Sequence, residues 1–159
     1  MLKDIVYLFQ NYEKIEKYQQ SLKTKQLKIE KTIKFTTLQV TKGQLPLKKA
    51  ITQYNYLKYE REKNELMQKR LQSIMNQTAE FYKRLSRKER HLVNYTMTEP
   101  NITAVIKAMN EHHSPYYLLD YNRDIRAIIT RWRTQTDITE QSIHGLQKEI
   151  RKLKNYEII

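Results

Sequence analysis

Apolar side chains recur every three or four residues along the first part of the chain, which is the spacing of one face of an α-helix. The stripe runs through Ile5, Leu8, Tyr12, Ile15, Leu22, Ile29 and Ile33 when Gln19 and Gln26 are counted as members. A sustained spacing of this kind is typical of a coiled-coil seam, in which polar members fix register and partner number. We therefore predict a helix that pairs specifically, either within its own chain or with another molecule.

A second long stripe follows an interruption. The segment from Phe35 to Pro46 contains β-branched residues, the first glycine and the first proline, so we predict a loop there. From Leu47 to about Leu85 the spacing returns, with seam positions that include Met67, Leu71, Ile74 and Phe81. We expect the two helices to form a basic antiparallel hairpin over residues 1–85.

Shorter helices follow, and capping signals mark their starts. Ser86 and Glu89 have the spacing of a capping box, as do Asp137 and Glu140. Thr98-Glu99-Pro100 and Ser114-Pro115 indicate two further helix starts, with each proline at the first helical position, where its missing N–H costs nothing. The expected helices cover about 86–97, 100–110 and 115–133, and together they form a head over residues 86–134. A C-terminal amphipathic helix follows over residues 135–159.

The helix expected over 115–133 has the clearest amphipathic pattern. Its inner stripe is Leu118, Tyr121, Ile125, Ile128 and Trp132, and we expect Trp132 to lie in the core of the head, against the 102–109 stretch. The 100° rotation per residue then turns outward Tyr116, Asp120, Arg123, Arg126, Thr130 and Arg131. Arginine pairs bidentately with guanine and binds phosphate, so this outer face is a candidate DNA-reading surface.

Composition supports an all-α fold. The chain has only 2 Gly and 3 Pro among 159 residues, and its abundant Lys, Glu, Gln and Leu favour helix. The absence of cysteine excludes disulfides and thiolate metal sites and suits a reducing compartment. No apolar run approaches the roughly 18 residues of a membrane span, so we expect a cytoplasmic protein without a membrane partner.

The net charge of +13 is unevenly distributed. Residues 1–88 hold 20 basic and 8 acidic side chains, whereas residues 89–159 hold 10 and 9. A balance this basic indicates a polyanionic partner or an acidic protein partner. The alternative is that lysine-rich helix surfaces only keep the protein solvated.

Signatures of an enzyme are absent from the sequence. It has no glycine-rich phosphate loop, no nucleophile elbow and no paired carboxylates in an apolar context. We therefore expect neither catalysis nor a cofactor. The adjacent His112 and His113 are the only histidine pair in the sequence, and adjacent histidines in a loop do not converge on one metal ion without further ligands, so we expect an exposed turn and no metal site.

Three short helices behind a basic hairpin have the outline of a helix-turn-helix domain. The run from Lys83 to Arg90 adds basic side chains at the capped helix start, and among them we expect phosphate contacts from Lys83, Arg84, Arg87 and Lys88. With a basic hairpin ahead of it, the stretch Leu85-Ser86-Arg87-Lys88-Glu89-Arg90-His91-Leu92-Val93 resembles the phage late-gene transcription regulators of the RinA, ArpU and LtrC type. Their heads are similar to the promoter-binding fourth region of bacterial sigma factors.

The resemblance implies a sequence-specific, double-stranded DNA-binding regulator of phage or mobile-element genes in a bacterial or phage-infected cell. Its hairpin would form a homodimer or contact RNA polymerase or another regulatory protein. The alternative is a helical adaptor or inhibitor that binds an acidic protein through its basic coiled coil, without DNA. Charge placement separates the two, because a DNA reader needs its arginines on the outer face of the 115–133 helix and an adaptor needs its basic surface on the hairpin.

Overall fold

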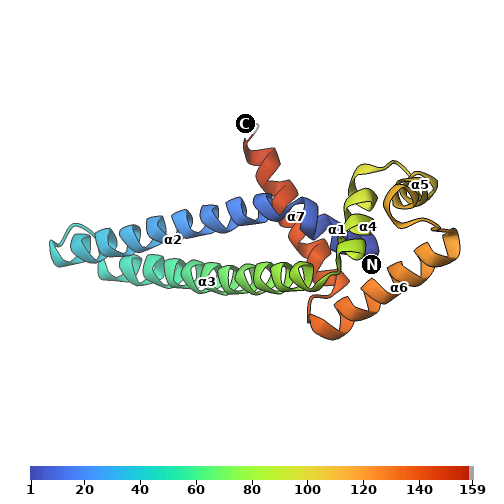
Figure 1. Cartoon of the computed structure of the whole chain (residues 1–159). Coiled ribbons are helices and arrows are strands. Elements are labelled where there is room, and N and C mark those ends of the chain that lie inside the picture. Colours follow the sequence, from blue (N-terminus) through green and yellow to red (C-terminus); the bar gives the residue numbers. More distant parts are fainter. Residues whose placement is uncertain (158–159) are drawn as a thin grey trace. The chain divides into compact units, whose positions relative to one another are not determined.

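The computed structural model describes residues 1–157, and the described chain is helical without any strand (Figure 1). The predicted all-α class is confirmed. None of the described helices is both long and apolar enough to cross a lipid bilayer. Residues 158 and 159 of the expected C-terminal helix lie outside the described part. The helices are α1 (Leu2–Gln10), α2 (Tyr12–Thr41), α3 (Leu47–Arg84), α4 (Arg87–Thr98), α5 (Ile102–His113), α6 (Leu118–Gln135) and α7 (Glu140–Glu157).

The chain divides into two compact units at points that differ from the expected boundaries. Residues 14–73 form one unit, here called the hairpin unit, and residues 1–13 with 74–159 form the other, the head unit. The N-terminal segment belongs to the head unit because α1 packs against α4 and α7. Asp4 Oδ1 also lies 3.0 Å from His144 Nε2. Seam positions that the sequence assigned to the hairpin therefore lie in the head unit, namely Ile5, Leu8, Tyr12, Ile74 and Phe81.

The first predicted helix is interrupted at Asn11, which the seam pattern did not indicate. Asn11 lies between α1 and α2, and its side-chain amide donates to the Tyr7 carbonyl at 2.9 Å. The Asn11 backbone N–H donates to the same Tyr7 carbonyl at 3.0 Å, so the side chain adds a second hydrogen bond at the C-terminal end of α1.

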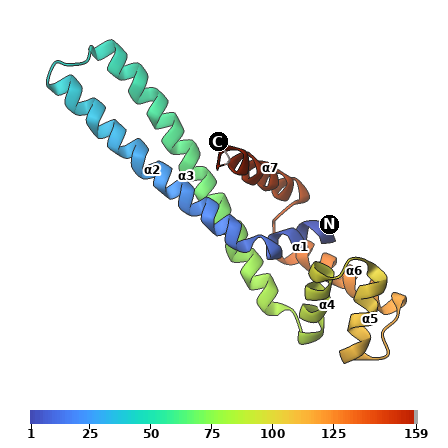
Figure 2. The same ribbon diagram turned by 90° about the horizontal axis from the view of Figure 1, so that it is seen from above.

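Within the hairpin unit, α2 and α3 run antiparallel and lie side by side (Figures 1 and 2). Gln19 Nε2 donates to Gln72 Oε1 at 2.8 Å, and Gln26 Nε2 donates to Glu65 Oε1 at 3.1 Å. The two glutamines that were counted as seam members therefore connect the helices. Around them the predicted seam positions are buried at Ile15, Ile29 and Leu71 and half-buried at Leu22 and Met67.

The loop predicted over Phe35 to Pro46 is wrong for its first seven residues, because α2 continues to Thr41. β-Branching lowers helix propensity only slightly, so these residues can remain helical. The hydroxyls of Thr37 and Thr41 each donate to the carbonyl four residues earlier, at 2.9 Å. The helix ends only where Gly43 adopts a φ of +71°. The Gly43 N–H donates to Val40 O and the Gln44 N–H to Gln39 O, which is a Schellman termination.

Three of the four predicted helix starts in the head unit are wrong, and each is replaced by a nearby cap. Asn101 caps α5 by accepting from the Ala104 N–H, so Pro100 stays outside the helix. α6 begins at Leu118 instead of Pro115, because Asp120 accepts from the Tyr117 N–H at 2.9 Å. The Thr139 hydroxyl accepts from the Ser142 N–H at the start of α7, whereas Asp137 binds Gln77.

Trp132 is completely buried, as its place in the stripe of α6 predicts. Its ring packs edge to face against Phe81 of α3, with centroids 4.9 Å apart, and against Phe9 of α1 at 6.4 Å. The indole N–H donates to the Ile138 carbonyl at 3.3 Å. These aromatic neighbours come from α1 and α3, and the expected packing against the 102–109 stretch stays a prediction. Leu118 at the other end of the stripe is 56% exposed, which corrects its assignment to the core.

We expect Trp132→Ala to lower the free energy of unfolding by about 3–5 kcal/mol, because a large aromatic side chain is removed from a closed core. Trp132→Phe should cost less, since it keeps a ring against Phe81 while losing the hydrogen bond to Ile138. Chemical denaturation followed by circular dichroism measures both variants. Tryptophan emission typical of a water-exposed indole in the native protein would contradict this placement.

Candidate nucleic-acid interface

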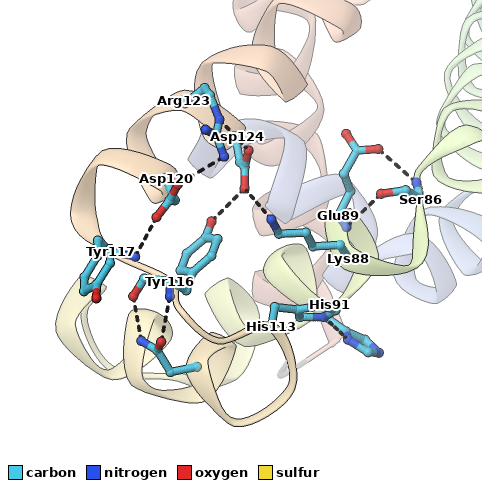
Figure 3. A network of polar contacts seen from close by, with 11 residues as sticks. Ser86, Lys88, Glu89, His91, His113, Tyr116, Tyr117, Asp120, Arg123 and Asp124 are labelled. Atoms are coloured by element: carbon cyan, nitrogen blue, oxygen red, sulfur yellow. Dashed lines mark hydrogen bonds and ion pairs between the residues drawn. The ribbon is translucent and has the colours of Figure 1, made fainter.

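The start of α4 is fixed by the capping box that the sequence predicts. The Glu89 N–H donates to Ser86 Oγ at 3.1 Å, and the Ser86 N–H donates to Glu89 Oε1 at 2.9 Å (Figure 3). Ser86 has extended backbone geometry, so the chain turns sharply between the end of α3 and α4. The two basic residues before this turn and the two after it are thereby brought to one junction.

Two arginines fold back on the junction and bind the C-terminal carbonyls of α3. Arg90 Nη2 donates to Lys83 O at 2.8 Å, and its Nε donates to Tyr82 O at 3.3 Å. Arg131 of α6 binds Glu89 Oε2 with one nitrogen and Arg84 O with the other, at 3.1 Å. The last carbonyls of a helix lack the N–H donors of a following turn, so the arginines supply donors to Lys83 O and Arg84 O. Tyr82 O also accepts from the Leu85 N–H at 3.2 Å. Arg131 was expected to face DNA, but it is half-buried in this intramolecular role.

The electrostatics of Glu89 reflect the same contacts. Burial alone would raise the pKa of Glu89, but the hydrogen bonds from the Ser86 N–H and from Arg131 more than offset it, so the pKa lies below its usual range. Glu89 therefore remains ionised beside the cations of the junction.

The start of α6 is held in place by Asn110 and Tyr116. The Asn110 side chain donates to Tyr116 O at 2.6 Å and accepts from the Tyr116 N–H at 2.7 Å. Tyr116 Oη donates to Asp124 Oδ2 at 3.0 Å, and Lys88 of α4 lies 3.9 Å from the same oxygen (Figure 3). Burial, with a further contribution from the hydrogen bond to Asp124, raises the pKa of Tyr116 above its usual value.

Tyr116 was expected on the outer face, and its position contradicts this, because only 1% of it is exposed. The cause is the later start of α6. Tyr116 lies in the link before the helix, where the 100° rotation does not apply, and it fills the space between α5 and α6. A buried tyrosine needs a partner for its hydroxyl, and Asp124 provides it.

The other predicted DNA-binding residues fall into two groups. Arg84, Arg87, Arg126 and Thr130 are exposed. Lys83, Lys88 and Arg123 take part in ion pairs within the head unit, among them Arg123 with Asp120 at 3.2 Å and Lys83 with Glu80 at 3.7 Å. The Lys83 and Arg123 side chains remain 73% and 66% exposed, and exposed ion pairs contribute little, so phosphate oxygens can compete for these cations.

A histidine cluster lies beside this site, and sequence reasoning missed its third member. His91 of α4 and His113 of α5 are hydrogen-bonded, with Nδ1 and Nε2 2.9 Å apart (Figure 3). The His112 ring centroid lies 5.8 Å from that of His91. Burial, with the neighbouring His91 and Lys88, holds the pKa of His113 below its usual range. The expected exposed turn is thus wrong for His113, which is half-buried at the end of α5. Among the described residues no group of three or more His, Cys, Asp or Glu is arranged to hold a metal ion.

Most of the net positive charge of the protein lies in the hairpin unit and not in the head unit. The hairpin unit holds 15 Lys and Arg and five Asp and Glu, a net charge of +10, which leaves +3 for the remainder of the chain. The junction at α4 is therefore a local concentration of cations on a unit that is otherwise close to neutral.

We predict that Glu89 makes the stability of the protein depend on pH. A lowered pKa in the folded state stabilises the fold above the ordinary carboxyl range, about pH 4, and this contribution is lost as the pH falls through the folded-state pKa. The melting temperature of Glu89→Gln should therefore lie below that of wild type at neutral pH, and the difference between the two melting temperatures should shrink in acid. Glu80→Gln, which changes an exposed carboxylate, is the control and should melt like wild type at neutral pH. A Glu89→Gln deficit that is equal at neutral and acid pH would contradict the interpretation.

Comparisons of the chain with protein-family models, with curated proteins and with solved structures found no match. The resemblance to the phage regulators consequently rests on the stretch from Leu85 to Val93 and on the order of the helices.

Proposed function

We propose that this protein is a sequence-specific DNA-binding transcriptional regulator of phage or mobile-element genes, and that its head unit binds the DNA. The observation that carries the proposal is the cationic junction at the start of α4. Lys83, Arg84 and Arg87 extend from it into solvent, while Arg90 and Arg131 bind the carbonyls behind them. Exposed cations around the first turn of a helix are suited to phosphate groups, because the amide dipoles of the helix favour negative charge there.

The outer face of α6 is suited to contact base edges beside such phosphate contacts. Leu119, Arg123, Arg126, Thr130 and Arg133 follow one another at 3-4 spacing, and all are exposed. The hydrogen bond from Tyr116 and the ion pair of Lys88 both end on Asp124, so α6 is tied to α4 and to the α5–α6 link. A rigidly held helix with an arginine-bearing outer face is the usual means of reading a major groove.

A second candidate is favoured by a separate observation. With a net charge of +10, the hairpin unit is the more basic part of the chain, as an adaptor that binds an acidic protein would need. In this alternative the cations of the head unit serve only its own structure, as Arg90 and Arg131 do, and DNA is not a ligand. The two candidates differ in which unit touches the partner.

DNA binding by single-residue variants tests the proposal. Duplexes selected from a random library by the wild-type protein supply the specific site, and gel-shift titrations over a salt series supply the affinities. We expect Arg87→Ala to weaken binding to all duplexes alike and to reduce the salt slope by about one unit, because one phosphate contact is lost. Arg126→Ala should cost about 1–3 kcal/mol on the selected site and relax its sequence preference.

Lys58→Ala is the matched control, since Lys58 is an exposed cation of the hairpin unit. It should bind the selected duplex with the specificity of wild type. If the library yields no preferred sequence, or if Lys58→Ala reduces binding as much as Arg87→Ala does, the head unit is not the DNA-binding part and the adaptor takes its place.

A further inference from the structure

A groove with apolar walls lies between α2 and α3 close to the loop that joins them. Its volume is about 230 Å³. Val40 and the side chains of Thr36, Thr37 and Thr41 form the wall on α2, and Ala50, Ile51 and Tyr54 form the wall on α3. The hydroxyls of Thr37 and Thr41 donate to carbonyls of their own helix, so these side chains present mainly their methyl groups.

Large apolar side chains remain exposed along the rim of this groove. Ile51 is 51% exposed, Tyr54 is 41% exposed, and Leu47 at the start of α3 is 65% exposed. Single exposed apolar residues are common on protein surfaces, but several of them beside a concave apolar site indicate a surface that another molecule covers.

The charge around the groove has one sign. Residues 31–59 contain six lysines and no aspartate or glutamate. Lys34 lies one turn before Thr37, and Lys58 lies one turn after Tyr54, so both exposed cations are surface neighbours of groove residues. An occupant must therefore bring apolar side chains for the groove and negative charge for its rim.

We propose that this groove binds an acidic amphipathic α-helix of a partner protein. Such a helix repeats apolar residues every three or four positions and carries carboxylates beside them, which matches an apolar groove flanked by lysines. A second copy of this chain is disfavoured, because two hairpin units of net charge +10 repel each other. A nucleic acid would neutralise the lysines but would leave Ile51 and the threonine methyls without apolar contact.

The groove belongs to the hairpin unit and the cationic junction to the head unit, so the inference does not rest on DNA binding. A DNA-binding regulator and an adaptor would both use such a surface to reach a partner protein. The variants that test it are accordingly confined to α3 within the hairpin unit.

The test uses the full chain and a fluorescently labelled synthetic peptide, helical by design, with leucines on one face and glutamates on the other. Binding is measured by fluorescence anisotropy. We expect saturable binding that Ile51→Asp weakens roughly tenfold or more, because the new carboxylate would be buried in the apolar contact and repelled by the peptide. Tyr59→Asp makes the same change in net charge on another face of α3, where Tyr59 is 61% exposed, and should retain affinity within about twofold.

Charge reversals on α3 provide a second matched pair that leaves the apolar residues intact. Lys58→Glu, on the rim, should weaken the peptide much more than Lys63→Glu, which lies on another face of the helix. Equal losses within both pairs would show that long-range attraction alone holds the peptide, and would overturn the assignment of the groove. Absence of peptide binding would overturn the proposed occupant. So would full competition by duplex DNA or by anionic lipid vesicles, if that competition is lost in Ile51→Asp.

Discussion

The edge-to-face contact between Trp132 and Phe81 is the interaction on which the head unit depends. It joins the C-terminal end of α6 to the C-terminal end of α3, and Phe9 adds the N-terminal helix to the same cluster. Large aromatic side chains contribute most to the stability of a small core, both through buried area and through ring geometry. The indole hydrogen bond to Ile138 also fixes the path of the chain from α6 into α7.

The aromatic cluster determines where the cations of the head unit lie. Phe81 precedes Ser86 by little more than one helical turn. Arg131 lies in the same helix as Trp132, directly before it. When the rings pack, Arg131 reaches the end of α3 and binds Glu89 and the Arg84 carbonyl. Two arginines thus neutralise helix ends, and Lys83, Arg84 and Arg87 remain available to a ligand. A sequence segment that reads as a uniform basic run is divided by the fold into structural and exposed members.

Sequence periodicity was sufficient for the helical class, for the extent of α3, for the Ser86 capping box and for the buried stripe from Tyr121 to Trp132, because all four depend on local spacing. It failed where a local signal had competitors nearby. Asn101, Asp120 and Thr139 replaced the expected helix starts at Pro100, Pro115 and Asp137, since several residue types within a few positions can each satisfy the first amides of a helix.

Errors about the candidate site came from contacts between different structural elements, some of them close in sequence and others far apart. The burial of Tyr116 depends on Asn110 and Asp124, and the pairing of Arg131 with Glu89 joins positions that are far apart in sequence. The return of α1 to the head unit and the meeting of His91 with His113 are of the same kind. No spacing rule within one helix encodes such contacts. The one local signal is Asn110, which lies shortly before His112-His113 and Pro115-Tyr116 and indicates a fixed turn there.

We propose that the head unit meets DNA through the junction at α4 and the outer face of α6. Amide chemical shifts of the isotope-labelled protein, followed by nuclear magnetic resonance during titration with a duplex, test it most directly. If the head unit binds DNA, the amide shifts of residues 83–90 and of the exposed face of α6 should change, and those of residues 31–59 should change little. Changes confined to residues 31–59, or none at saturating duplex, would contradict it.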